Sequence, residues 1–260
     1  MKILFIGDVV GRPGRTALEA RLGRLIDRHA VDLVVANGEN AAAGFGLTND
    51  VARDLFSFGI DVLTSGNHIW DKREIYDQLE NDSRLLRPAN YPAGLPGRGV
   101  GIYRTAGDIP VGVINLEGRV FMNNLDCPFR AADALVEELR RQTSVILVDF
   151  HAEATSEKVA LGHYLDGRVS LVVGTHTHVQ TADEQILPGG TAYLTDAGMT
   201  GSRDGVIGIR KELSIERFLT QVPVRFEVAK KDPVLCGLVV EIDEGTGRAL
   251  AVERVSEMIG

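Results

Sequence analysis

The stretches KILFIGD (2–8), DLVVANGEN (32–40) and DVLTSGNH (61–68) decide the fold class of this 260-residue chain. Each is an apolar run that fits a buried strand and ends in glycine followed by polar residues. Helices expected at 13–30 and from Thr48 to about Phe58 separate these strands. Such strand–helix–strand units predict a mostly parallel sheet, in which ligands bind at the carboxyl ends of the strands.

The rest of the chain predicts a second sheet packed on the first, within one domain of residues 1–260. SVILVDFHAE (144–153) and VSLVVGTHTH (169–178) fit two more buried strands that end in histidine. The further expected elements are helices at 71–81, 131–142 and 155–166, antiparallel strands at 100–105 and 109–115, and strands near 184–187, 191–195, 224–228, 234–242 and 249–255. The expected architecture is α/β, with two packed mixed β-sheets flanked by helices.

Composition and charge narrow the class of protein. The apolar run at the N-terminus breaks at Gly7-Asp8, before the roughly 7–15 apolar residues of a signal peptide, and no stretch approaches the roughly 18 that span a bilayer. We therefore expect a cytoplasmic protein without a membrane partner. Cys127 and Cys236 have no metal-site spacing and are expected to stay reduced.

The net charge of −8 argues against a broad nucleic-acid surface, which is normally basic. It does not exclude a phosphate substrate, because bound dications reverse the local field.

The polar residues at the five strand ends form a candidate metal site. The seven candidate ligands are Asp8, Glu39, Asn40, Asn67, His151, His176 and His178. Carboxylate, imidazole and amide donors together favour manganese, iron or zinc over magnesium and calcium. Seven donors exceed one tetrahedral site and suit two ions about 3.5–4 Å apart. His29 and His163 are expected on helices, in structural roles.

The order of these residues resembles the calcineurin-like metallophosphoesterase superfamily, whose blocks are D-x-H, G-D, G-N-H-D/E, a lone His and G-H-x-H. Four positions depart from that pattern. Val10 replaces a metal-binding His, Glu39 replaces the bridging Asp, Thr175 follows Gly174 before His176, and Asp71 lies three residues after His68. With ILFIGDVVGRPGR, NGENAAAGFGLT and SGNHIWDKREI, the pattern is similar to the bacterial YmdB-type phosphodiesterases, which hydrolyse 2′,3′-cyclic nucleotides.

The resemblance implies a role for each residue. The first metal would be held by Asp8, Asn40 and His178, the second by Asn67, His151 and His176, and both by Glu39. The implied cofactors are two transition-metal ions, iron or manganese, with zinc as the alternative. A hydroxide bridging them would attack a cyclic nucleotide or other phosphate ester. His68 would then act as the general acid, or would only donate a hydrogen bond to the phosphate.

Other functions fit the same residues. One is a phosphomonoesterase or nucleotidase on the same metals, and another is a nucleotide-sensing regulatory protein of RNA turnover. A closed structural metal site fits seven ligands poorly. The sequence does not define the residues that contact the substrate, and it is compatible with a homo-oligomer. The candidate contacts, each with a structural alternative, are Trp70, Tyr76, Arg12, Arg15 and the segment 195–205.

Overall fold

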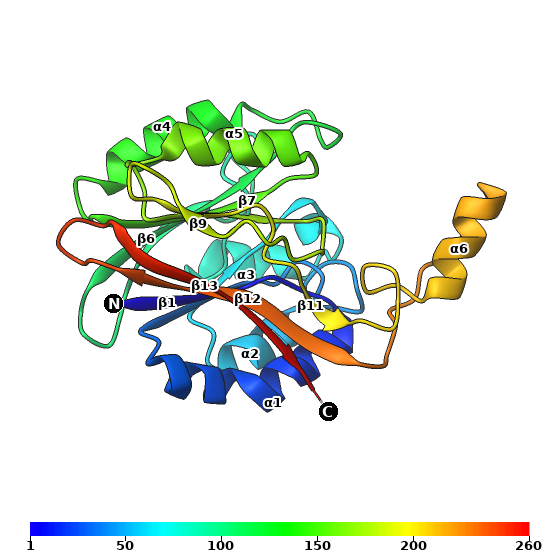
Figure 1. The fold of residues 1–260 in the computed structure, drawn as a ribbon. Helices are drawn as coiled ribbons and strands as arrows, with labels where there is room; N and C mark the ends of the chain where they lie inside the picture. Colours follow the sequence, from blue (N-terminus) through cyan, green and yellow to red (C-terminus); the bar gives the residue numbers. More distant parts are fainter. Residues whose placement is uncertain (260) are drawn as a thin grey trace.

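Two β-sheets pack face to face in the computed structural model, which describes residues 1–259 (Figure 1). The first sheet has the strand order β2–β11–β12–β1–β3–β4, with β13 pairing with β12, and the second has the order β5–β6–β7–β8–β10–β9. Helices α1, α2 and α3 pack on the outer face of the first sheet, and α4 and α5 pack on the outer face of the second. The predicted fold class, α/β with two packed mixed β-sheets flanked by helices, is confirmed.

The elements have the following bounds. The strands of the first sheet are β1 (Lys2–Ile6), β2 (Asp8–Val9), β3 (Leu33–Asn37), β4 (Val62–Thr64), β11 (Met199–Ser202), β12 (Pro233–Ile242) and β13 (Ala249–Met258). Those of the second sheet are β5 (Val100–Arg104), β6 (Pro110–Glu117), β7 (Val145–His151), β8 (Leu171–Thr175), β9 (Gln185–Ile186) and β10 (Ala192–Leu194). The helices are α1 (Gly11–His29), α2 (Asn49–Ser57), the 3₁₀ turn η1 (Asn67–Trp70), α3 (Ile75–Asn81), α4 (Pro128–Leu139), α5 (Thr155–Leu165) and α6 (Lys211–Thr220).

The apolar runs pair in parallel, as the sequence predicts. Strand β1 pairs with β3, and β3 pairs with β4, all in the same direction, while β6, β7 and β8 are parallel in the second sheet. Phe5 and Val35 from the first sheet meet Leu147 and Val173 from the second in the core between them. The carboxyl ends of these strands therefore lie along one edge of the sandwich.

The C-terminal third differs from the prediction. Strands β11, β12 and β13 join the first sheet, and β12 lies antiparallel between β1 and β11, so the second half of the chain does not form the second sheet alone. The strand expected at 224–228 is wrong, because Val228 makes only one isolated bridge, to Ile209. The helix expected at 71–81 begins only at Ile75, and α6 was not predicted.

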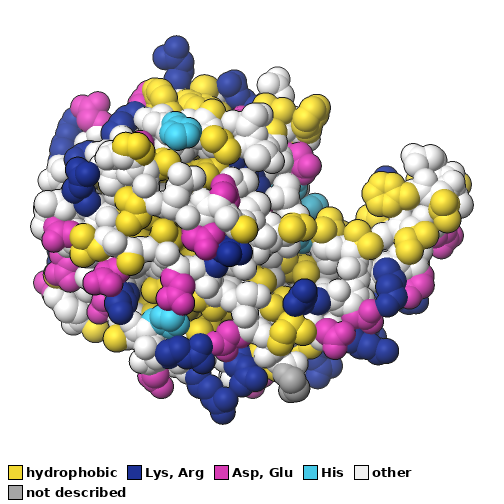
Figure 2. Space-filling model, viewed as in Figure 1, with side chains coloured by type: hydrophobic (Ala, Val, Ile, Leu, Met, Phe, Trp, Pro, Cys, Tyr) yellow, Lys and Arg dark blue, Asp and Glu magenta, His cyan; other side chains and the backbone are white. Residues whose placement is uncertain are grey.

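Helix α6 extends away from the two sheets (Figure 1). Its apolar residues Ile215, Phe218 and Leu219 are 53%, 75% and 79% exposed, and Val222 follows at 59%. Figure 2 shows hydrophobic side chains on this protruding segment. The helix therefore does not draw its stability from any of the three hydrophobic clusters, two under the outer helices and one between the sheets.

Two further findings concern the chain as a whole. Within residues 1–259, no helix combines the length and the apolar character that crossing a bilayer requires. Cys127 is partly buried and Cys236 is buried, and both are free thiols.

Candidate metal centre and active site

The structure brings all seven predicted ligands together at the carboxyl edge of the sheets. Asp8 lies in β2 directly after β1, and Glu39 and Asn40 follow β3. Asn67 begins η1 after β4, His151 ends β7, and His176 and His178 follow β8. Contacts of 3.0–3.9 Å join these side chains across both sheets. Five segments that are distant in the sequence therefore build one site.

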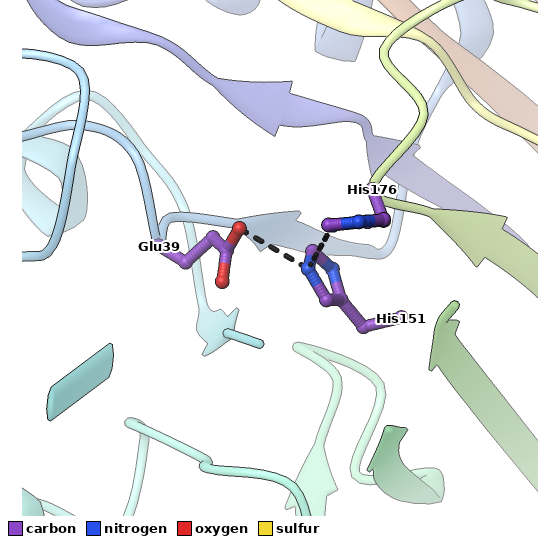
Figure 3. Close-up of side chains that lie close together, drawn as sticks. All are labelled: Glu39, His151 and His176. Atoms are coloured by element: carbon purple, nitrogen blue, oxygen red, sulfur yellow. Dashed lines mark hydrogen bonds and ion pairs between the residues drawn. The ribbon is translucent and has the colours of Figure 1, made fainter. Parts of the chain in front are cut away.

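The ring of His151 is the centre of one group of donors (Figure 3). Its Nε2 lies 3.0 Å from Oδ1 of Asn67, 3.0 Å from Nδ1 of His176 and 3.1 Å from Oε1 of Glu39. One imidazole nitrogen carries at most one proton and cannot donate to three acceptors. The ligand atoms of Glu39, His151 and His176 lie within 4.8 Å of one another, as expected for residues that share a cation.

Each of the three histidines is held through its other ring nitrogen. His151 Nδ1 lies 3.0 Å from the Thr175 hydroxyl, His176 Nε2 lies 3.1 Å from the Glu153 carboxylate, and His178 Nδ1 donates to the Ile207 carbonyl at 2.9 Å. Bonds of this kind fix the tautomer and the orientation of metal-binding histidines. The nitrogens left facing the site are Nε2 of His151, Nδ1 of His176 and Nε2 of His178.

A second group of donors surrounds Asp8. Its Oδ1 is buried, has no hydrogen-bond partner among residues 1–259, and lies 3.8 Å from Nε2 of His178 and 3.9 Å from Nδ1 of His151. Asn40 also has a buried Oδ1 without a partner in that range, while its Nδ2 donates to Glu39 Oε1 at 3.0 Å. Unpaired buried oxygens are costly, so these two atoms fit a role as metal ligands. A half-turn of the Asn40 amide would exchange its two atoms.

The residues His176 to His178 form a strained loop, whereas the sequence predicts that they end a strand. Strand β8 ends at Thr175, and His176 and His178 have φ of 95° and 63°, a region that non-glycine residues rarely occupy. Asp196 fixes this loop, since its Oδ2 accepts from the backbone N–H of Thr177 at 3.1 Å and from Nζ of Lys158 at 2.7 Å. Both members of this ion pair are buried.

Gly66 allows the two sheets to meet at the site. A Cβ atom at this position would lie 2.1 Å from Cδ2 of His151. Gly66, in the predicted strand 61–68, is therefore required because the His151 ring lies so close to it.

His68 lies beside the candidate ligands and lines one pocket with Glu39, Asn40, His176 and His178, here called the metal pocket. Its backbone N–H donates to Glu39 Oε2 at 3.0 Å, and its Nδ1 lies 2.9 Å from the Asp71 carboxylate. The 3₁₀ turn η1 places residues i and i+3 above one another, so Asp71 reaches His68 across three positions. The edge of the Phe45 ring packs against His68, with ring centroids 5.1 Å apart.

Burial and charge shift the pKa values of the central groups in the metal-free protein. Burial lowers the pKa of His151, but the charges of Glu39 and Asp8 outweigh it and raise this pKa to about 9. Burial and the charge of His151 lower the pKa of His176 to about 3. Burial raises the pKa of Asp8. In the metal-free protein, a proton on His151 thus offsets the negative charge of the buried Glu39 and Asp8 carboxylates, as a bound cation would.

Other predicted contacts have structural roles. Trp70 packs edge-on against Tyr76 and Tyr91, so neither predicted stacking residue lines the pocket. Arg15 donates to the Ala41 carbonyl at 2.6 Å. The segment 195–205 contains β11, which pairs with β2 next to Asp8, and the pocket wall comes from Ile207 and Ile209 after it.

Besides Ile207, Ile209, Lys158 and Asp196, the sequence analysis missed other residues that hold or line the site. Phe45 and Phe226 line the pocket, Glu153 holds His176, and Asp149 accepts from Thr175. Glu153 and Asp149 each lie two residues from His151, which is the one signal that the sequence offered.

Comparison with known proteins places the chain in a family. The model of the YmdB-like protein family matches residues 4–255. The chain belongs to the YmdB-like protein family. A 2′,3′-cyclic-nucleotide 2′-phosphodiesterase of Bacillus subtilis (strain 168) is 52% identical over 98% of this chain and 96% of that protein. A putative phosphatase/phosphodiesterase of Mycoplasma pneumoniae is 34% identical over 98% of this chain and 92% of its own length.

Solved structures agree with this assignment. A hypothetical protein from Thermus thermophilus matches with a TM-score of 0.93 and 45% identity, over 99% of both chains. A Mycoplasma pneumoniae phosphatase matches with a TM-score of 0.93 and 34% identity, over 99% of this chain and 93% of its own. The predicted family and the predicted enzyme class, a phosphodiesterase, are confirmed for this YmdB-like protein.

Proposed function

We propose that this YmdB-like protein hydrolyses 2′,3′-cyclic nucleotides with the help of two transition-metal ions. One observation carries the proposal: three histidines turn their free ring nitrogens toward one another and toward buried carboxylates. His151 Nε2 and His176 Nδ1 are only 3.0 Å apart, and two lone pairs at that distance repel unless a proton or a cation lies between them. The Bacillus subtilis relative, named for this substrate, supports the same interpretation.

The donor set fits two cations. We propose that Asp8, Asn40 and His178 hold one ion, that Asn67, His151 and His176 hold the other, and that Glu39 contacts both. Nitrogen donors mixed with carboxylate and amide oxygens favour iron or manganese, with zinc as the alternative. Bound cations of this kind lower the pKa of water and neutralise phosphate charge.

The protein's own side chains supply the rest of the chemistry. A water oxygen forms a bond to phosphorus and the water releases one proton, the bond from phosphorus to the ribose O2′ breaks, and the leaving oxygen takes up one proton. His68 is placed to give that proton, because it lines the pocket and its side chain is 29% exposed. Since the Asp71 carboxylate accepts at Nδ1, Nε2 of His68 is the nitrogen left to serve the substrate.

Metal content and substrate preference test the proposal together. We expect about two transition-metal ions per chain by elemental analysis. With added Mn²⁺, 2′,3′-cAMP should be opened faster than a simple phosphomonoester is cleaved. The Glu39→Ala variant, made as a control, should lose metal and activity together. A protein without bound metal that hydrolyses neither ester would refute the proposal, and a faster phosphomonoester reaction would favour a phosphatase.

We also propose that the whole chain acts as one domain. Strand β12 comes from the C-terminal part yet pairs with β1 in the middle of the first sheet. Removal of β12 and β13 would therefore expose the core residues Ile3 and Phe5 of β1.

A further inference from the structure

A second, larger groove adjoins the metal pocket. The metal pocket encloses about 290 Å³, and the groove encloses about 760 Å³. Phe226 lines both, while the neighbours Gly44 and Ala43 line the pocket and the groove respectively. Ligand pockets usually measure about 300–1,000 Å³, so the metal pocket alone is small for a substrate larger than a mononucleotide. The groove is the adjacent space into which a longer substrate would extend.

The groove is basic in a protein whose net charge is −8. Arg12, Arg225 and Lys230 line it, and all three are exposed. Within residues 1–259, no carboxylate lies within ion-pair distance of these three side chains. Glu227 is the acidic residue of the groove, and it already pairs with Arg210 at 3.0 Å. The groove therefore presents three positive charges that the protein does not neutralise.

Building on the proposed function, we propose that this groove binds the phosphate backbone of an RNA end. The protein would then open 2′,3′-cyclic phosphates at the ends of short oligoribonucleotides as well as on free nucleotides. A cyclic phosphate occupies O2′ and O3′ of the last ribose, so the chain can continue only through its 5′ side. With the reactive end at the metals, the preceding phosphates would leave the pocket toward the groove. Arg12, Arg225 and Lys230 are suited to receive them.

Phe226 suits the junction between the two spaces. Its side chain is partly exposed, and single-stranded nucleic acids commonly stack their bases on aromatic rings beside a basic groove. The chemical step is unchanged. Water adds across the bond between phosphorus and O2′, and the product is an oligonucleotide that ends in a 3′-phosphate. No other reactant is needed.

The decisive comparison uses the metal-loaded protein with 2′,3′-cAMP and with the trinucleotide ApApA ending in a 2′,3′-cyclic phosphate. We expect kcat/KM for the trinucleotide to be at least about tenfold higher at low ionic strength, since each charge-assisted contact contributes roughly that factor. Its dependence on salt should also be steeper, with a log–log slope of about −1.4 for contacts to its two internucleotide phosphates.

Substitutions in the groove test whether it causes the preference for the trinucleotide. Replacing Arg12, Arg225 and Lys230 together by Gln should reduce the preference for the trinucleotide at least about tenfold and flatten its salt dependence. The matched control replaces three exposed arginines that line neither space, namely Arg24, Arg98 and Arg130. The control changes the net charge equally and should keep the preference.

The outcomes separate this inference from the proposed function. If 2′,3′-cAMP is opened but the trinucleotide is not preferred, or if both triple variants behave alike, the groove proposal is wrong and the proposed function stands. If neither ester is opened, the proposed function fails. Binding of a fluorescent ApApA 3′-phosphate to the metal-free protein then still tests the groove proposal. The groove variant should bind it at least about tenfold more weakly than the control variant.

Discussion

Nδ1 of His151 lies 3.0 Å from the hydroxyl oxygen of Thr175, and this bond decides which ring nitrogen faces the candidate metal centre. The hydroxyl has a single proton, which it donates to Oδ1 of Asp149 at 2.7 Å. It can therefore only accept from His151, so Nδ1 carries a proton, and in the neutral ring the lone pair of Nε2 faces the site. Thr175, which interrupts the superfamily pattern, thus orients the ring of His151, a candidate metal ligand.

Removal of this hydroxyl should weaken metal binding. We expect Thr175→Val to lower metal affinity about 10–100-fold, because ligand-orienting hydrogen bonds have effects of that size. Thr175→Ser keeps the hydroxyl and should retain most of the affinity. Titration with Mn²⁺ in a metal buffer measures both variants, and an unchanged affinity in Thr175→Val would show that the bond does not position His151.

The buried pair of Lys158 and Asp196 should stabilise the loop that carries His176 and His178. Loss of one partner leaves an uncompensated charge in the core, so we expect Lys158→Met to lower the free energy of unfolding by about 3–5 kcal/mol. Lys158→Met combined with Asp196→Asn should lose less, because no unpaired charge remains. Urea denaturation of the metal-free proteins gives these values. Equal losses in the single and double variants would argue that the charge is not the cause.

Gly66 offers a test of the close contact between the sheets. In Gly66→Ala the new methyl group would meet the His151 ring at 2.1 Å, so the ring must move and metal affinity should fall at least about tenfold. Gly23→Ala is the matched control, since a Cβ there has no neighbour within 4 Å and α1 should gain about 0.5–1 kcal/mol. Metal titration and thermal unfolding compare the two. Full metal binding by Gly66→Ala would contradict the close approach of the His151 ring to Gly66.

The sequence predicted strands β1, β3 and β4 of the first sheet and the clustering of the candidate ligands at one edge, because both depend on local patterns. The apolar runs that become β1, β3 and β4 end in polar residues, and parallel strands bring such ends together. The return of β12 beside β1 could not be predicted, since an antiparallel partner in the middle of a sheet leaves no mark on either strand. The positive φ of His176 and His178 was equally hidden, because the loop between them is held by Asp196, 19 residues after Thr177.

Metal affinity should depend on pH through His151. Its pKa of about 9 in the metal-free protein lies above the ordinary value of 6.5, so a metal ion must displace a proton at lower pH. Apparent affinity should therefore rise about tenfold per pH unit from about pH 7 to about pH 9. Because its pKa is raised in the folded state, protonated His151 paired with Glu39 stabilises the metal-free fold below about pH 6.5. This contribution is lost as pH rises through about 9. Calorimetry in two buffers measures the proton released, and binding without proton release would refute the assignment.

The last prediction separates two roles for His68. His68→Ala should keep both metal ions, since the residue contacts Glu39 only through its backbone, and should lower turnover of 2′,3′-cAMP by about 10²–10⁴. If His68 protonates the leaving oxygen, the variant should lose little activity on bis-p-nitrophenyl phosphate, whose leaving group needs no proton. If His68 only stabilises the phosphate charge, both substrates should lose activity alike. Asp71→Asn keeps an acceptor beside Nδ1 and should have a smaller effect on both. Loss of metal in His68→Ala would instead mean that His68 is needed to build the metal site.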